Sequence, residues 1–438
     1  MSKKKVRDYV KPLLPEQVFK AIEPSGHLLE AIALSSLSGR PARKMHVIGV
    51  TGTNGKTTTS FMIHSILVEA GLKTALMTTV GYGIDRNIAP QIEHMTTIAP
   101  AVLQRRLKAF KQASVDWLVM EVTSHALAQH RAWGVPYEIA VLTNVTHEHL
   151  EYHGTFERYR KAKLKLFKVA ARHGRKLGVV NADDPSAELF MAATPNSLSY
   201  GLKNGTVVPK NIKSRPDGSS YDVTLEGTTY HIQCNIPGEF NVANSLAAVC
   251  VAHSLGLPKE AIERGIESLK QVEGRMNTIS VGQPYSAIID FAHTPDAFER
   301  LLSDLRKSTK GKLVVVFGSA GRRDVAKRAE QGRIAGKYCD ELVLTEEDDR
   351  DENGNDILEQ IASGAREQGK TDDKDLFKVL DRTEAINFAV TRVAKPEDTV
   401  IFLGKGHEKT IERADGVHPW TESETVRKAI LASMKRNE

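Results

Sequence analysis

The fold is decided by the stretch His46-Val47-Ile48-Gly49-Val50-Thr51-Gly52-Thr53-Asn54-Gly55-Lys56-Thr57-Thr58-Thr59. The apolar run 47–50 predicts a buried strand, and residues 60–70 have the pattern of a helix. A glycine-rich turn between them lets backbone N–H groups approach phosphate oxygens, and the start of the helix adds partial positive charge. The stretch therefore predicts a polyphosphate-binding loop.

The side chains of this loop have separable roles. Lys56 is placed to reach the β- and γ-phosphates, and the Thr57 hydroxyl is a candidate Mg²⁺ ligand. Val50 stands where the strict Walker pattern has glycine, so a glycine turn that only precedes a helix is the alternative. We favour nucleotide binding, with a candidate loop made of Gly52, Thr53, Asn54, Gly55, Lys56, Thr57 and Thr58.

The composition is that of an ordinary globular protein with more than one domain. The chain has 438 residues, of which 41% are hydrophobic and 26% charged, and its net charge is +6. The basic segment 158–176 lacks an interleaved aromatic platform, which favours a solvated helix face over a nucleic-acid groove. We therefore expect no nucleic-acid partner.

The cysteines and the apolar segments indicate the compartment. Cys234, Cys250 and Cys339 are scattered and form no CxxC pair, which argues against a disulfide framework and a zinc ribbon. The basic N-terminus lacks the apolar core of a signal peptide, and no window approaches the roughly eighteen apolar residues of a membrane span. We expect a cytoplasmic protein without a membrane span.

Two sets of strand-length apolar runs alternate with helical segments, which predicts two α/β units with parallel sheets. Region 197–237 is more polar and predicts short antiparallel strands, and the helical pattern of residues 15–37 has breaks at Pro24 and Gly26. We predict a short helical segment at 1–44, a central domain at 45–273 and a C-terminal domain at 274–438. The predicted strands are 47–50, 74–80, 117–122, 139–145 and 177–181, and then 287–291, 313–318, 341–345, 376–380 and 399–404.

Polar residues follow two of the buried strands. Glu121 ends an apolar run, so its carboxylate should emerge beside the phosphate loop as a Mg²⁺ ligand; a capped or solvated strand end is the alternative. His147 and His149 follow the next strand, and such a pair alone is a weak metal signal. Residues 159–167 predict an amphipathic helix on which the pattern alone makes Lys163 a surface residue.

Taken in order, these motifs resemble the Mur ligases, most closely the tripeptide-synthetase (MurE) type, over residues 46–432. Besides the phosphate loop, the resemblance rests on Glu121-Val122-Thr123-Ser124-His125, Asn144 with His149-Leu150-Glu151-Tyr152-His153-Gly154, Ala162-Lys163, Asn181-Ala182-Asp183-Asp184-Pro185, Pro237-Gly238-Glu239-Phe240-Asn241-Val242-Ala243-Asn244, Gly274-Arg275, Asp290-Phe291-Ala292-His293-Thr294-Pro295-Asp296 and Gly404-Lys405-Gly406-His407-Glu408.

The resemblance implies a P-loop central domain with a parallel sheet and a Rossmann-like C-terminal domain. It also implies an ATP-dependent peptide ligase of peptidoglycan synthesis, in which ATP phosphorylates a muramoyl-peptide carboxylate and the amine of an amino acid attacks the acyl phosphate. Glu121, His149 and a carbamylated Lys163 match the family's Mg²⁺ site, next to Thr57. The implied nucleotide residues beyond the loop are Asn241, Asn244, Arg275, Asp290 and His293.

On the substrate side, the resemblance implies that Thr96, Thr97, Thr123, Gln129 and Arg131 hold the muramoyl peptide. Ile98 and Ala99 separate the threonine pair from Pro100, where the family has Thr-Thr-Pro. Arg131 suits a carboxylate or phosphate, because guanidinium binds such groups through two parallel hydrogen bonds.

The selector of the added amino acid departs from the family pattern. Glu347-Asp348-Asp349-Arg350 stands where diaminopimelate-adding enzymes have Asp-Asn-Pro-Arg, and residues 346–356 hold seven acids against one base. Two interpretations stay open, a solvated acidic loop or a site for a cationic amino acid. In the second, Arg350 or Arg323 pairs with its carboxylate while Asp348, Gly404 and Glu408 contact the rest, which indicates lysine or meso-diaminopimelate.

The segment ahead of the phosphate loop is shorter than the uridine-diphosphate-binding domain that MurE-type enzymes carry there. We hypothesise that uridine recognition is reduced or rebuilt. The alternatives to a tripeptide synthetase are another amide ligase of the Mur or folylpolyglutamate type, and a catalytically silent nucleotide-binding scaffold. We expect a monomer whose partners are its substrates.

Overall fold

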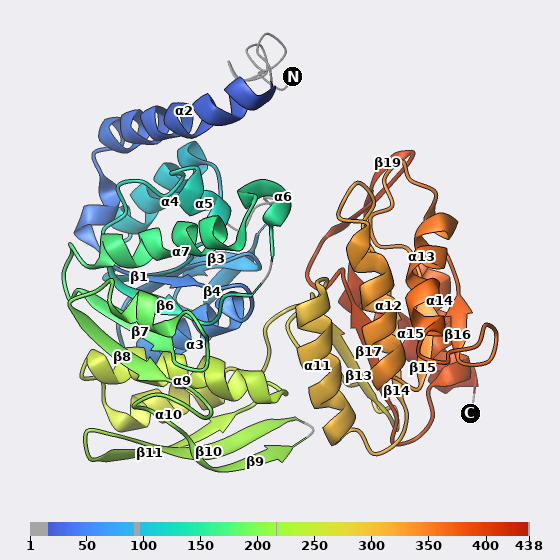
Figure 1. The fold of residues 1–438 in the computed structure, drawn as a ribbon. Coiled ribbons are helices and arrows are strands. Elements are labelled where there is room, and N and C mark those ends of the chain that lie inside the picture. The colour runs from blue at the N-terminus through green and yellow to red at the C-terminus, as the bar shows by residue number, and fades with distance from the viewer. Residues whose placement is uncertain (1–15, 92–96, 147, 216, 437–438) are drawn as a thin grey trace. The chain divides into compact units, whose positions relative to one another are not determined.

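The computed structural model describes residues 16–91, 97–146, 148–215 and 217–436, which form two compact units (Figure 1). The first unit comprises the described residues of 1–145, 152–208 and 246–265, and the second comprises those of 146–151, 209–245 and 266–438. The predicted domain boundaries at 44/45 and 273/274 stay a prediction. Each unit is built around its own parallel sheet.

The first unit contains an eight-stranded sheet in the order β4-β3-β2-β5-β1-β6-β7-β8. From β2 to β8 neighbouring strands pair in parallel, whereas β2, β3 and β4 pair as antiparallel neighbours. The strands are β1 (His46–Thr51), β2 (Thr74–Met77), β3 (Gly81–Ile84), β4 (Asn87–Pro90), β5 (Trp117–Glu121), β6 (Tyr137–Leu142), β7 (Leu177–Asn181) and β8 (Asn196–Tyr200). The five strands predicted for this half are therefore confirmed.

Helices pack on this sheet because β1, β5 and β6 are apolar at nearly every position. Helix α3 contacts β2 and β5, and α7 contacts β6 and β1. Side chains of α4 and α7 share one core with alternate residues of the central strands, among them Val47, Leu118 and Ala140. The helices are α2 (Glu16–Leu37), α3 (Lys56–Glu69), α4 (Pro100–Gln112), α5 (Ser124–Ala128), α6 (Leu150–His153), α7 (Phe156–Ala170) and α8 (Ala187–Met191), with a 3-10 turn η2 (Pro41–Lys44).

The second unit contains a six-stranded sheet in the order β12-β13-β17-β14-β15-β16, parallel apart from β12. Its strands are β12 (Asn277–Ile279), β13 (Ser286–Asp290), β14 (Leu313–Phe317), β15 (Glu341–Leu344), β16 (Leu376–Lys378) and β17 (Thr399–Leu403). The accompanying elements are α11 (Pro295–Ser308), α12 (Ala326–Tyr338), α13 (Gly354–Arg366), α14 (Arg382–Phe388), the π-helical turn η3 (Ala389–Val393), a hairpin of β18 (Thr410–Arg413) and β19 (Gly416–Pro419), and α15 (Glu422–Arg436). The five strands predicted for this half are confirmed, and so is the α/β class of the fold.

A three-stranded antiparallel sheet of β9 (Lys210–Arg215), β10 (Gly218–Leu225) and β11 (Thr228–Cys234) also groups with the second unit. Helices α9 (Glu239–Ser254) and α10 (Lys259–Ser268) have residues in both units. Among the described residues, no helix is long and apolar enough to cross a membrane.

Two local predictions were wrong. Region 197–237 was predicted to hold antiparallel strands only, but β8 pairs in parallel with β7 and extends the first sheet. Helix α2 runs through Pro24 and Gly26, where breaks were predicted. A proline removes one hydrogen bond from a helix, and the remaining turns of a 22-residue helix keep theirs.

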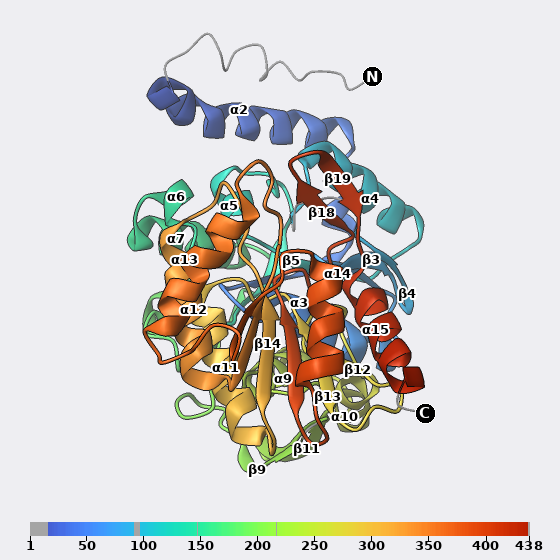
Figure 2. The same cartoon turned by 90° about the vertical axis from the view of Figure 1, so that its right-hand side faces the viewer.

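Helices α12 and α13 lie side by side and approach each other through a glycine from each (Figure 2). A Cβ at Gly332 would come within 1.9 Å of the Ile361 carbonyl oxygen, and one at Gly364 within 1.8 Å of the Ala329 carbonyl oxygen. Both contacts involve backbone, which cannot turn aside as a side chain can. The two helices could not keep this spacing with any larger residue at either position.

We predict that Gly364→Ala lowers the free energy of unfolding by about 1–3 kcal/mol, because the helices must separate to admit the methyl group. Gly26→Ala is the matched control: Gly26 also lies in a helix, but a Cβ there meets nothing within 4 Å. Gly26→Ala should raise the free energy of unfolding by up to ~1 kcal/mol, because alanine has a higher helix propensity than glycine. Urea titrations measure the free energy of unfolding of both variants and of the wild type. Equal changes in the two variants would contradict the packing argument.

Candidate active site

The loop between β1 and α3 has the geometry of a phosphate site. Gly55 caps α3 with a φ of 84°, and no side chain caps the helix at that residue. A Cβ at Gly52 would come within 1.8 Å of the Thr143 hydroxyl, so only glycine fits there. The first-turn N–H groups of a helix have no intrahelical partner and therefore suit an anion. The Lys56 ammonium donates to the Thr53 carbonyl at 2.7 Å.

Asn144, at the end of β6, holds this loop through a pair of hydrogen bonds. Its amide oxygen accepts from the Asn54 N–H at 2.9 Å and its amide nitrogen donates to the Asn54 carbonyl at 3.0 Å. The Thr53 N–H donates to the Asn144 carbonyl at 2.8 Å. The sequence contained Asn144 only as a motif residue without a role; its place near the end of the predicted strand 139–145 was the available signal.

Glu121 is buried at the C-terminal end of β5, with 2% of its surface exposed. One carboxylate oxygen accepts from the Thr57 hydroxyl at 2.9 Å, and from the N–H and hydroxyl of Thr79 at 3.0 and 2.9 Å. Among the described residues, no basic side chain forms an ion pair with it. The solvated alternative for Glu121 is therefore wrong, and Thr79 is a contact that the sequence analysis missed.

A buried carboxylate held by neutral donors beside a threonine hydroxyl has the oxygen donors that Mg²⁺ prefers. Thr57 and Glu121 thus fit the predicted ion. Within the described parts of the chain, no three His, Cys, Asp or Glu side chains gather as a preformed metal cluster. Oxygens from the nucleotide's phosphates would have to complete the coordination, as is usual for Mg²⁺.

Lys163 is buried, with 1% of its surface exposed, which corrects the surface position that the helical pattern predicted. Its ammonium donates to the Gly52 carbonyl at 2.5 Å and lies 4.5 Å from the centre of the Tyr159 ring. The Tyr159 hydroxyl lies 2.9 Å from the Thr53 hydroxyl. The face of α7 that carries Lys163 turns inward because α7 packs on β6 and β1, and periodicity alone could not reveal that.

Three of the predicted muramoyl-peptide residues lie together beside Glu121. The Thr97 hydroxyl accepts from the Thr123 N–H at 3.1 Å, and the Arg131 guanidinium donates to the Thr97 carbonyl. Burial lowers the pKa of Arg131 to about 10. Gln129 follows the last turn of α5, where its N–H donates to the His125 carbonyl, and Thr96 lies outside the described residues.

The predicted adenine-side residues, which group with the second unit, also form a pair. The Asn244 side chain donates to the Asn241 amide oxygen at 2.8 Å, and the Asn241 side chain donates to the Pro237 carbonyl at 2.6 Å. Both asparagines are buried. His149, in segment 146–151 of the same unit, has its Nε2 3.6 Å from a Glu148 carboxylate oxygen; its place in the metal site stays a prediction.

The remaining predicted nucleotide residues gather around Phe291, which follows β13. The Arg275 guanidinium carbon lies 4.8 Å from the centre of the Phe291 ring, and the rings of His293 and His407 lie 4.8 and 4.9 Å from it. The Asp290 carboxylate accepts from the N–H groups of Met276 and Ala292, both at 2.8 Å. Burial raises the pKa of Asp290 and lowers that of His293, and it lowers that of His407 to about 3.

The first acids of the segment after β15 are not solvated, because Glu346, Glu347 and Asp349 are all buried, whereas Asp351 and Asp356 further along are exposed. Glu346 pairs with Arg413. Glu347 has a buried oxygen without a hydrogen-bond partner, and a Cβ at Gly404 would come within 2.8 Å of that oxygen. Burial is the main cause that raises the pKa of Glu347, and it raises the pKa of Asp349 to about 6. The solvated-loop interpretation is wrong for these residues.

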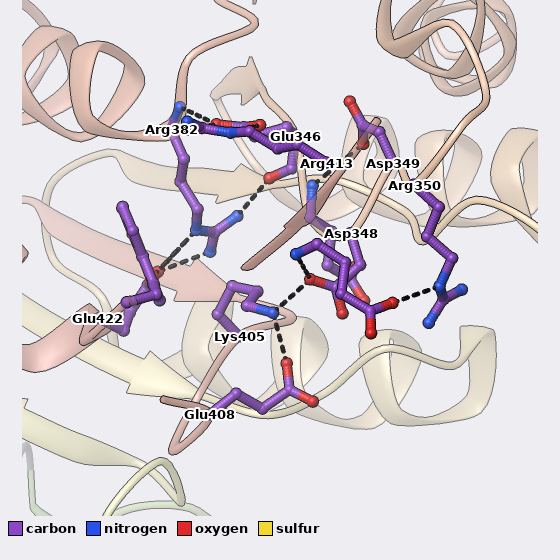
Figure 3. Close-up of polar contacts among 12 residues, drawn as sticks. Glu346, Asp348, Asp349, Arg350, Arg382, Lys405, Glu408, Arg413 and Glu422 are labelled. Carbon is purple, nitrogen blue, oxygen red and sulfur yellow. Dashed lines mark hydrogen bonds and ion pairs between the residues drawn. The ribbon is translucent and has the colours of Figure 1, made fainter. Parts of the chain in front are cut away.

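Other predicted amino-acid contacts already have partners within the protein (Figure 3). The Lys405 ammonium lies between Asp348 and Glu408, at 2.7 Å from a carboxylate oxygen of each. The Arg350 Nε donates to Glu412 at 2.7 Å. Arg323 is exposed, and its neighbour Arg322 pairs with Asp351. Lys405 was not among the candidate residues, although its place in the glycine-rich motif after β17 was a signal.

Together, the phosphate loop, the buried Glu121 and the parallel sheets define an α/β nucleotide-dependent enzyme. The Mur ligase middle domain matches residues 50–252, and the Mur ligase, glutamate ligase domain matches residues 274–406. The chain belongs to the Mur ligase family, and it is an ATP-dependent ligase that forms C–N bonds.

Individual relatives agree with this assignment. The UDP-N-acetylmuramyl-tripeptide synthetase of Roseiflexus sp. is 39% identical over 421 residues, covering 93% of this chain and 82% of its own length. A UDP-N-acetylmuramoyl-L-alanyl-D-glutamate–2,6-diaminopimelate ligase of Caldanaerobacter subterraneus is 35% identical over 403 residues, covering 92% and 81%. A solved structure of a ligase with the latter name is 31% identical, with a TM-score of 0.63, and the match covers 89% of this chain and 79% of that one.

The raised pKa of Asp349 predicts a pH-dependent stability. A carboxyl group whose pKa rises from 3.8 to about 6 on folding stabilises the fold below pH 3.8, and this stabilisation is lost as the pH rises through 6. The melting temperature of Asp349→Asn should therefore rise relative to that of the wild type as the pH increases from 4 to 7. Thermal unfolding across this range measures the difference.

Asp351→Asn is the matched control with the opposite sign. Arg322 lowers the pKa of Asp351 from 3.8, so this carboxylate contributes stability that is present above pH 3.8 and is lost as the pH falls below it. The difference between the melting temperatures of the variant and the wild type should therefore stay constant between pH 4 and 7 and change only below pH 3.8. If the difference between Asp349→Asn and the wild type did not change with pH, Asp349 would not titrate as described.

Proposed function

We propose that this ligase adds a diamino acid, lysine or meso-diaminopimelate, to a muramoyl-dipeptide carboxylate in peptidoglycan precursor synthesis. The observation that carries the proposal is the buried Thr57–Glu121 pair at the start of α3, which fits the magnesium complex of ATP. The names of the relatives support the substrate class, because they add an amino acid to a muramoyl peptide or are tripeptide synthetases.

The reaction has two steps. A carboxylate oxygen of the acceptor attacks the γ-phosphorus of ATP, and ADP leaves, which gives an acyl phosphate. The neutral amine of the amino acid then attacks the acyl carbon, phosphate leaves with the bonding electrons, and the amine loses a proton to form the amide. The first-turn N–H groups of α3 and the Lys56 ammonium hold the transferring phosphoryl group.

On the nucleotide side, Mg²⁺ bound through Thr57 and Glu121, with His149 and a carbamylated Lys163 as further ligands, would neutralise charge on the phosphates. Carbamylation converts a cation into an anion, which removes the electrostatic objection to a lysine at this position. Asn241 and Asn244 hold the adenine, and Arg275, Asp290 and His293 complete the nucleotide site when the C-terminal domain closes.

On the acceptor side, Thr97, Thr123, Gln129 and Arg131 hold the muramoyl peptide. The Arg131 guanidinium donates to the Thr97 carbonyl, and a guanidinium suits a carboxylate or phosphate of the acceptor because it binds such groups through parallel N–H donors. The affinities for the UDP-linked and for the free muramoyl dipeptide decide whether the acceptor carries the uridine nucleotide. A large loss of affinity on removal of UDP would contradict the hypothesis that uridine recognition is reduced.

On the amino-acid side, the buried acids after β15 favour a substrate with a positive charge. Glu347 and Asp349 have raised pKa values, because their burial is not fully compensated by basic groups, and a bound ammonium would supply the missing charge. We also propose that the protein works as a monomer in the cytoplasm, where thiols such as the buried and free Cys234, Cys250 and Cys339 stay reduced.

The test is ADP release with UDP-N-acetylmuramoyl-L-Ala-D-Glu and ATP, offering lysine, diaminopimelate and ornithine separately. Turnover that depends on one diamino acid is expected, and Lys56→Ala should abolish it because the phosphate contacts are lost. ATP binding without turnover for any amino acid, with UDP-linked or free acceptor, would contradict the proposal and favour a silent scaffold.

We predict that Lys163→Ala abolishes ligation, that added bicarbonate does not restore it, and that the variant keeps its fold. Lys165→Ala is the control, since Lys165 lies on the same helix and donates to the Leu127 carbonyl at 3.3 Å rather than to the phosphate loop. After incubation with ¹³C-bicarbonate, a carbamate signal should appear in the ¹³C NMR spectra of the wild type and of Lys165→Ala, and it should be absent from that of Lys163→Ala. Near-normal turnover of Lys163→Ala would show that the carbamate assignment is wrong.

A further inference from the structure

Arg382, the first residue of α14, is fully buried and donates to three different segments of the second unit (Figure 3). Its guanidinium donates to the Glu346 carbonyl at 3.0 Å and to the Leu403 carbonyl at 2.8 Å. It also forms an ion pair with the buried Glu422 carboxylate of α15, at 2.6 Å. One side chain thus links the chain after β15, the end of β17 and the start of the last helix.

The two carbonyl groups lie at the ends of strands that are not neighbours: Leu403 is the last residue of β17, and Glu346 follows the end of β15 by two residues. The sheet order places β14 between β17 and β15, so no ladder of hydrogen bonds joins the ends of these two strands directly. Arg382 spans the gap at the C-terminal edge of the sheet. This edge is where the ligands of parallel α/β sheets bind.

Each anchored carbonyl directly precedes residues of the amino-acid site. Glu346 leads into the acids at 347–349, and Leu403 leads into the segment 404–408, which carries Lys405 and Glu408. The two segments meet where Lys405 pairs with Asp348 and where the Glu347 carboxylate packs against Gly404. A shift of either segment would change these contacts, because they join side chains of one segment to the other: a Cβ at Gly404 would come within 2.8 Å of a Glu347 carboxylate oxygen.

The arrangement requires an arginine. Its planar fork offers five N–H donors in fixed directions, and here they reach two carbonyl groups and a carboxylate at once. A lysine offers three donors on a single nitrogen and could keep the ion pair but not the whole set. The backbone N–H of Arg382 adds a bond to the Glu346 carboxylate at 3.1 Å.

We propose that Arg382 is a positioning residue for the amino-acid site, which sets the spacing between segments 346–349 and 404–408. The inference rests on the proposed function for the identity of the amino acid and for the place of its site in these two segments. It concerns a residue that does not touch the substrate. A purely structural Arg382 would stabilise the unit without a selective effect on amino-acid binding.

The test compares Arg382→Lys and the double variant Arg382→Gln/Glu422→Gln with the wild type. The double variant removes both charges of the Arg382–Glu422 ion pair, so it keeps the test valid if Arg382→Lys folds poorly. The control is Trp420→Phe, which removes the other bond to Glu422, at 2.7 Å, and leaves both carbonyl contacts in place. KM values for the diamino acid and for ATP, with kcat, are measured for each protein.

For both Arg382 variants we expect the KM of the diamino acid to rise by about tenfold or more, with the KM of ATP within about threefold of the wild type. Trp420→Phe should lower the melting temperature without changing this ratio. Equal rises in both KM values, or the same ratio in Trp420→Phe, would overturn the proposal.

Amide hydrogen exchange supplies a readout that does not need turnover. In the Arg382 variants, exchange should rise in segments 346–350 and 404–408 together, and Trp420→Phe should leave both unchanged. If the wild type used no diamino acid, the proposed function would fail, whereas this joint rise would still support positioning. A rise in hydrogen exchange that is confined to α14 and α15 would overturn the proposal that Arg382 positions the two segments.

Discussion

The buried carboxylate of Glu121 is the constraint on which the rest of the first unit's site depends. A carboxylate loses a large hydration energy on burial, and it is retained only where donors or a cation replace the water. Here one oxygen receives hydrogen bonds from Thr57 and Thr79, which follow different strands. The same group therefore fixes the first turn of α3 against the edge of the sheet and provides negative charge where a phosphate-bound cation would lie.

In both units, a side chain holds segments that lie beyond the C-terminal ends of the parallel strands. Loops at the C-terminal edge of such a sheet carry the functional groups, but no strand ladder extends that far to hold them. Asn144 fastens the phosphate loop by pairing with the backbone of Asn54. Arg382, the first residue of α14, donates to the Glu346 carbonyl and to the Leu403 carbonyl and so holds two segments of the proposed amino-acid site. In each case one side chain satisfies backbone groups of a segment far away along the chain, which limits how far that segment can move.

The features that the sequence predicted well are those with a local cause. Buried strands of a parallel sheet are nearly continuous apolar runs, so all ten predicted strands were found. The phosphate loop and Glu121 were predicted because each directly follows such a run. Lys163 was misplaced by pattern alone because an amphipathic helix does not reveal which neighbour covers its polar face.

The acidic segment shows a second limit. A run of charged residues usually marks a solvated loop. The fold instead pairs Glu346 with Arg413 and buries Glu347 beside Gly404. Some partners of these acids lie far along the chain: Lys405 is 57 positions from Asp348, and Arg413 is 67 positions from Glu346. Contacts of that kind have no signature in a single sequence.

The central claim is that this chain activates a carboxylate by transferring a phosphoryl group to it from ATP. The most direct test uses a muramoyl dipeptide with both oxygens of the reacting carboxylate labelled with ¹⁸O, and mass spectrometry of the phosphate released during amide formation. The account predicts one ¹⁸O atom in each inorganic phosphate, because the acyl phosphate breaks between carbon and the bridging oxygen. Unlabelled phosphate, or the label in AMP, would contradict it.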